Sequence, residues 1–229
     1  MQQVDRRVEH SHHFSSMDQE HESGKQGAWL FMATEVMMFG ALFVGYFMYR
    51  GLYHDAWVVG GELLNWKLGA TNTIVLLLSS FTMALAVRDT QMGQNKKAIA
   101  KIIVTTLCAM AFMVVKYFEY SGKISSGLFP GAWAPTAEYM DKINGIVEAK
   151  GLSNFNIENL RLFFVVYFVM TGLHGIHITI GIGLMLWLWK RLKNEEFSKD
   201  YYTAVEGVGL YWHIVDIIWI YLFPLMYLM

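Results

Sequence analysis

The sequence predicts an all-α membrane protein, a bundle of five transmembrane helices. Hydrophobic residues make up 55% of the chain and charged residues only 16%, with a mean hydropathy of +0.32. Charged residues make up about 25% of a soluble domain. The charges are also clustered, so five long stretches contain almost none. In lipid the backbone is satisfied only in helices or closed barrels, and these stretches are longer than barrel strands of about 9–11 residues.

Each of the five stretches is near or above the roughly 20 residues with which a helix crosses about 30 Å of hydrocarbon. They cover residues 28–50, 70–87, 98–118, 162–189 and 208–229. Cationic and aromatic side chains mark their ends, which is typical of residues that reach the headgroup layer. We interpret Lys116, beside Tyr117, as such an interfacial anchor.

Residues 1–27 are polar and form a predicted tail before a single transmembrane domain, residues 28–229. This tail has no apolar signal region, so the first span is expected to act as the insertion signal. Residues 119–160 are predicted to be the one long loop. The tail contains four histidines, which could bind a metal, although a solvated arm is the simpler interpretation. They are His10, His12, His13 and His21.

The Lys and Arg residues predict the orientation. With a cytoplasmic N-terminus, eleven of the eighteen lie in the tail and in the two short connections on the same side. The remaining seven are spread over longer segments on the other side. The positive-inside rule therefore favours a cytoplasmic N-terminus and an outer C-terminus.

Ionisable residues at membrane depth are costly and indicate function by default. Glu35 lies in the first span among apolar residues, where the neutral form of a carboxyl is favoured. It could exchange protons near a proton path, or it could be a hydrogen-bonded carboxyl that holds two helices together. Both interpretations stay open on the residues alone.

Two further spans hold ionisable side chains at helical spacing. His174 and His177 lie three positions apart, as do His213 and Asp216, and Glu206 lies two turns before His213. We expect Glu206, His213 and Asp216 to form a polar stripe. A metal site is the less favoured interpretation, because no Glu-x-x-His pair of the di-iron type lies in a span. An interhelical hydrogen-bond network is favoured.

Small residues recur in the fourth span at Gly175, Thr179 and Gly183, and Gly40 and Gly45 lie in the first span. This pattern predicts close helix packing. One cysteine, Cys108, excludes a disulfide scaffold, and a net charge of −1 gives no sign of nucleic-acid binding. Nucleotide-binding and metalloprotease motifs are absent from the sequence.

Several strings, in order, resemble subunit III of the haem-copper cytochrome c oxidases, in the short five-helix bacterial type. They are WLFMATEVMMF at 29–39, NTIVLLLSS at 72–80, Glu119-Tyr120, TGLHGIH at 171–177, and Glu206 followed by YWHIVDIIW at 211–219. The resemblance runs from about residue 27 to the C-terminus. The tail and the 119–160 segment match poorly.

The resemblance implies an accessory subunit without a redox centre in a proton-pumping terminal oxidase of the bacterial cytoplasmic membrane. It implies direct contact with subunit I, subunit II as a further partner, and haem and copper on those partners. It implies bound phospholipid in a cleft between helices. The family residue that matches Glu35 is associated with proton uptake, and those matching His174, His177, Glu206 and His213 lie in the cleft region.

Two other classes remain open. One is a close relative, subunit III of a quinol oxidase or the similar accessory protein of nitric oxide reductase. The other is an independent membrane channel or transporter. That class would require a continuous polar pore, and the third span offers few side chains to line one.

Overall fold

The computed structural model describes residues 17–197 and 202–228, and this part of the chain contains seven α-helices and no strand. They are α1 (Met17–Leu52), α2 (His54–Glu62), α3 (Trp66–Gln91), α4 (Asn95–Ser125), α5 (Ala137–Lys150), α6 (Ile157–Lys193) and α7 (Thr203–Tyr227), with a short 3-10 helix, η1 (Pro130–Ala132). Of these, α1, α3, α4, α6 and α7 are long and apolar enough to cross a membrane. The predicted fold class is confirmed.

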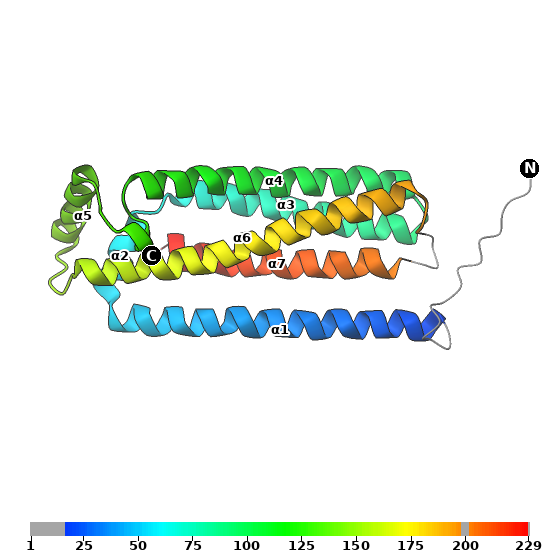
Figure 1. Ribbon diagram of the computed structural model, residues 1–229, viewed down its shortest axis with the longest axis horizontal. Coiled ribbons are helices and arrows are strands. Elements are labelled where there is room, and N and C mark those ends of the chain that lie inside the picture. The colour runs from blue at the N-terminus through cyan, green and yellow to red at the C-terminus, as the bar shows by residue number, and fades with distance from the viewer. Residues whose placement is uncertain (1–16, 198–201, 229) are drawn as a thin grey trace, which may run out of the picture.

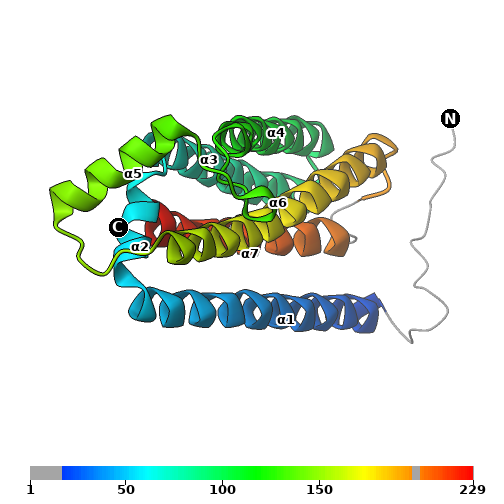
Figure 2. The ribbon, with the colours of Figure 1, turned by 60° about the vertical axis from the view of Figure 1, so that its left-hand side comes forward.

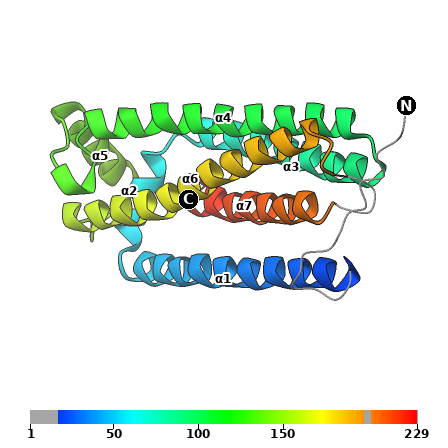
Figure 3. The same ribbon diagram turned by 45° about the vertical axis from the view of Figure 1, so that its right-hand side comes forward.

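The long helices run along one axis and form a bundle with one separate member (Figure 1). Helices α3, α4, α6 and α7 pack together, with α3 against α4 and α7, and α6 against the same two helices. Helix α1 lies alongside and contacts mainly α7 (Figure 3). Fully buried aromatic side chains fill the bundle, among them Trp212, Trp219 and Phe112.

The two ends of the bundle differ. Helix α1 begins at the same end as the α3–α4 and α6–α7 connections (Figure 1). The opposite end carries α2, η1 and α5 (Figure 2). We call these the connection end and the capped end.

The long helices extend beyond most of the predicted spans. Helix α1 begins at Met17, inside the predicted tail, because the Glu, Gln and Lys residues there are good helix formers that can continue a helix out of the hydrocarbon. His10, His12 and His13 lie outside the described residues, as does the side chain of His21.

The interpretation of residues 119–160 as a loop was wrong in part. Helix α4 continues to Ser125, and α5 forms within the segment. Helix α5 is amphipathic, with Ile143 fully buried, and it ends at Lys150, followed by Gly151, whose φ of 62° is a left-handed conformation that suits glycine. A short amphipathic helix has too little apolar sequence to register as a span.

Close packing uses other glycines than the predicted ones. A Cβ atom at Gly175, Gly183, Gly40 or Gly45 would meet nothing within 4 Å in the described part of the chain. A Cβ atom at Gly181 would instead lie 2.6 Å from the Trp212 ring, so α6 and α7 approach closely only because this residue lacks a side chain. The glycines of the four-residue repeat therefore do not make the close helix contact within the described part of this chain. Gly181, which lies outside the repeat, makes it.

Candidate functional site at the α1–α6–α7 junction

Glu35 of α1 and His177 of α6 meet near the middle of their helices. Glu35 Oε2 lies 2.8 Å from His177 Nε2, and the two side chains are 13% and 10% exposed. His177 Nδ1 lies 2.7 Å from the Leu173 carbonyl oxygen. That oxygen can only accept, so Nδ1 carries a hydrogen. The contact therefore sets an acid beside a base, although Glu35 Oε2 has no partner in full hydrogen-bond geometry among the described residues.

Neighbouring side chains fix the imidazole of His177. The Phe39 ring packs edge-on against it, with centroids 5.4 Å apart. The Tyr211 hydroxyl of α7 donates a hydrogen bond to the His177 carbonyl oxygen at 2.8 Å. Three helices therefore meet at one buried polar contact. The sequence pattern indicated Glu35 and His177 on separate spans but did not predict that they form a pair.

An apolar groove of about 250 Å³ adjoins this junction. Its lining comes from α1, α6 and α7 and includes Phe31, Met32, Ile180, Leu184 and Tyr211. Phe31 and Met32 lie one turn before Glu35, so the groove extends from the pair toward the connection end. Its chemistry suits a hydrocarbon chain.

His174 is separated from His177 despite the shared spacing. Its ring is fully buried, stacked on Trp219 at 5.2 Å between centroids and edge-on to Phe112 at 5.6 Å. Neither of its ring nitrogens has a hydrogen-bond partner among the described residues. His174 is thus part of the bundle core, and His177 faces α1.

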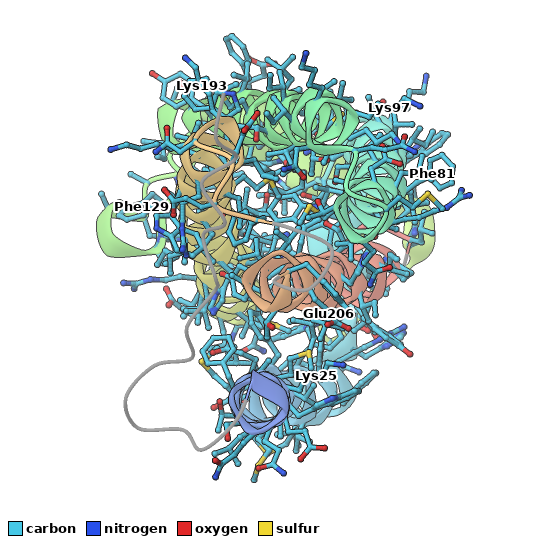
Figure 4. All side chains as sticks on the ribbon, turned by 90° about the vertical axis from the view of Figure 1, so that its right-hand side faces the viewer. Lys25, Phe81, Lys97, Phe129, Lys193 and Glu206 are labelled. Atoms are coloured by element: carbon cyan, nitrogen blue, oxygen red, sulfur yellow. The ribbon has the colours of Figure 1, made fainter. Side chains whose placement is uncertain are left out.

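The predicted stripe of Glu206, His213 and Asp216 does not form one site. Glu206 lies at the start of α7, 3.8 Å from Lys25 of α1 (Figure 4). His213 is half-buried, and its Nδ1 lies 2.7 Å from the Ser80 hydroxyl of α3. Asp216 is 2% exposed behind this pair. The stripe divides because α7 has different neighbours along its length.

The structure contains a buried charged cluster that the sequence interpretation missed. Lys116 is not an interfacial anchor: it is 6% exposed, and its Nζ donates to Glu119 Oε2 at 3.0 Å and to the Tyr227 hydroxyl at 2.9 Å. Tyr227 donates to the other Glu119 oxygen at 2.7 Å. The Lys-x-x-Glu spacing in 116–119 was the signal available in the sequence.

The cluster also encloses the ammonium group in aromatic rings. Nζ of Lys116 lies 4.9 Å from the Trp219 ring and 5.3 Å from the Tyr167 ring. Cation–π contacts are stronger when they are desolvated. The cluster therefore links α4, α6 and α7 near the capped end.

The part of the chain that the structure describes contains no group of three or more His, Cys, Asp or Glu side chains placed to hold a metal ion. Glu35 with His177, and Lys116 with Glu119, are instead pairs in which an acid meets a base. Such contacts can hold or exchange protons and can join helices.

The family model for cytochrome c oxidase subunit III matches residues 7–134 and 147–229. The chain belongs to this family. The match spans all five long helices, so the subunit III resemblance of the short strings is confirmed over nearly the whole chain. Members of the family are subunits of haem-copper oxidases.

Several curated relatives match this subunit III chain over most of its length. Quinol oxidase subunit 3 of Bacillus subtilis is 28% identical over 97% of this chain and 98% of that protein. Cytochrome c oxidase subunit 3 of Thermostichus vulcanus is 28% identical over 89% of this chain and 86% of that protein. The haem-copper oxidase subunit I+III of Aeropyrum pernix is 27% identical over 89% of this chain, which covers 22% of that longer protein.

Proposed function

We propose that this chain is the accessory, non-redox subunit III of a proton-pumping terminal oxidase that reduces oxygen to water. It stabilises subunit I by direct contact and belongs to the same complex as subunit II. It also binds phospholipid and supports proton uptake. Haem and copper lie on the partner subunits. Family membership over all five long helices supports this role, and so does the apolar outer surface of the bundle.

The proposed place of the chain is the bacterial cytoplasmic membrane, with the connection end at the cytoplasm. The higher density of Lys and Arg at that end supports the orientation. The capped end, with α2 and α5, then lies on the outer side. The translocase activity belongs to the whole complex, in which this chain acts on proton supply rather than on electron transfer.

The Glu35–His177 pair is the observation that carries the proton role. The pair places a carboxyl 2.8 Å from an imidazole at the middle of the span, and the two partners lie on different helices. Transfer of a proton between the carboxyl and the imidazole keeps the net charge of the pair at zero, whereas its release would leave an uncompensated carboxylate in lipid, which favours taking up another proton. The pair therefore suits a proton store that refills from the cytoplasmic side.

The groove beside the pair supports the lipid role. Its lining is apolar and it reaches toward the connection end, as an acyl chain anchored by a headgroup there requires. A second groove of about 300 Å³ lies between α4 and α6, with Tyr120 and Thr171 in its lining. The two grooves support the proposal that lipid chains bind between helices of this chain.

The test uses the purified complex with Glu35→Gln and, as a matched control, Glu206→Gln. We expect a hydrophobic carbodiimide to label Glu35 and to slow sustained turnover, and Glu35→Gln to abolish labelling and shorten the period of full activity. Glu206→Gln is expected to keep both properties, since Glu206 lies at a helix end. Unchanged labelling and turnover in Glu35→Gln would refute the proton role.

A quinol oxidase is the second candidate for the complex. The observation in its favour is that a quinol oxidase subunit 3 aligns over 97% of this chain, whereas the cytochrome c oxidase relative aligns over 89% of it. Oxygen uptake by the purified complex with reduced cytochrome c or with a short-chain quinol distinguishes the two. Activity with quinol alone would assign the second candidate.

A further inference from the structure

Helices α3 and α7 are joined by a row of side-chain hydrogen bonds. Trp212 Nε1 donates to the Ser79 hydroxyl at 3.0 Å, and Trp219 Nε1 donates to the Thr73 hydroxyl at 3.1 Å. Both bonds face the inside of the bundle. The third contact, Ser80 with His213 at 2.7 Å, lies at the outer margin of the same row.

His213 lies far from both ends of its membrane-spanning helix, yet its side chain is partly exposed on the outer surface of the bundle. It comes ten residues after the start of α7, about 15 Å along a helix axis, which places it near the middle of the hydrocarbon. Its ring is half-buried, and the apolar side chains next to it are outward-facing. Leu77 is 49% exposed, Ile217 50% and Ile220 40%. We call Leu77, Ser80, His213, Ile217 and Ile220 the Ser80–His213 patch.

The patch has more hydrogen-bonding capacity than the chain itself satisfies. His213 Nδ1 faces Ser80, and Nε2 has no hydrogen-bond partner among residues 17–197 and 202–228. Asp216 is 2% exposed and lies close enough to Ser80 for its carboxyl to interact with that hydroxyl, although neither carboxyl oxygen meets full hydrogen-bond geometry within the described structure. A second, buried polar group thus lies directly behind the exposed one.

Hydrocarbon cannot cover such a patch without cost. An acyl chain offers no donor or acceptor to Nε2, and lipid headgroups lie about 15 Å away in a 30 Å hydrocarbon layer. Ionisable side chains at this depth normally face protein or a water-filled cavity. Helix α1 does not cover the patch, because Leu77, Ile217 and Ile220 stay exposed with α1 in place. Helix α1 contacts α7 instead through Phe43 and Tyr221, whose ring centroids are 6.5 Å apart.

We infer that the Ser80–His213 patch is the docking site for a transmembrane helix of a partner oxidase subunit, which presents a hydroxyl, amide or N–H side chain to His213. The inference rests on the proposed role as an accessory subunit. The apolar rim provides van der Waals contact, and one polar pair at the centre fixes the register of the two helices.

The first test replaces Ile217 with a photoreactive amino acid in the full complex. We expect a crosslink to a different oxidase subunit. Crosslinks to lipid alone, or to a second copy of this chain, would overturn the inference. If no haem-bearing subunit copurifies with the unmodified chain, the proposed function itself fails, and that result is distinct from a missing crosslink in an intact complex.

The second test measures how much of this chain stays with the complex during a detergent wash. His213→Leu should lower retention roughly three- to fifteenfold, the effect of one interhelical hydrogen bond in a membrane. His213→Gln, which can still form such a bond, should restore most of it. Thr71→Ala, which removes an exposed hydroxyl of α3 outside the patch, is the control and should leave retention within about twofold. Equal losses in Thr71→Ala and His213→Leu would show an effect unrelated to the patch and overturn the inference.

Discussion

The Tyr46 hydroxyl of α1 donates a hydrogen bond to the backbone carbonyl of Leu225, in the last turn of α7. The final carbonyl groups of a helix have no partner within the helix. An unpaired carbonyl group is costly in lipid, so the Tyr46 hydroxyl stabilises the end of α7 as well as the contact between α1 and α7. The contact joins α1 to α7 at the capped end, and the contact between Lys25 and Glu206 lies at the other end.

Tyr46→Phe is expected to destabilise the chain by about 1 kcal/mol, because the ring stays in place and the contacts of the hydroxyl with the Leu225 carbonyl and with Arg50 are lost. The measurement is a denaturant titration of the purified complex in mild detergent. Tyr221→Phe is the control, since Tyr221 is 61% exposed and contributes mainly its ring. Equal effects of the two variants would contradict the assignment.

Lys25→Ala is expected to change stability by less than about 1 kcal/mol, because its contact with Glu206 is long and solvent-accessible. The same titration measures it. A loss as large as that in Tyr46→Phe would mean that the connection end contributes as much to α1 docking as the capped end.

Lys116→Met should be severely destabilising, by about 3–5 kcal/mol, because it leaves Glu119 buried without its cation. The double variant Lys116→Met with Glu119→Gln should recover much of this loss. A double-mutant cycle on the yield of folded chain in mild detergent measures the coupling. Independent, additive effects of the two changes would show that the pair is not a unit.

Gly181→Ala is expected to cost about 1–3 kcal/mol, because the added methyl group overlaps the Trp212 ring. Gly183→Ala, on the same helix with open space around it, should be neutral or slightly stabilising. Thermal unfolding in detergent compares the two. A similar loss in both would indicate a general helix effect rather than the α6–α7 contact.

The fold was predictable because a helix that crosses the hydrocarbon must be long and almost continuously apolar. The same pattern could not show α2 or α5, which lie at the capped end and need only one apolar face. The same pattern led to the wrong prediction for Lys116. A lysine near the end of a span gives the same sequence pattern whether its side chain reaches the headgroups or is buried between helices. Only the fold brings Tyr227 and Glu119 around its ammonium group.

The candidate site was predictable as a set of residues but not as pairs. Depth alone selected Glu35 and His177, since polar groups in a span are rare. Their pairing depends on how α1 is rotated relative to α6. The spacing of residues along a single helix carries no information about that rotation. Likewise, the three-residue spacing of His174 and His177 predicted neighbours, yet their rings point to different helices.

The attachment of α1 to α7 has a consequence for biosynthesis. Helix α1 is the first of the long helices to leave the ribosome, and α7 is the last. The first helix therefore waits in the bilayer: Glu35 lacks His177 until α6 has been inserted, and Tyr46 lacks the Leu225 carbonyl until α7 has been inserted. Because this longest-range contact closes last, an incomplete chain exposes a polar helix surface that quality-control proteases of the membrane can recognise.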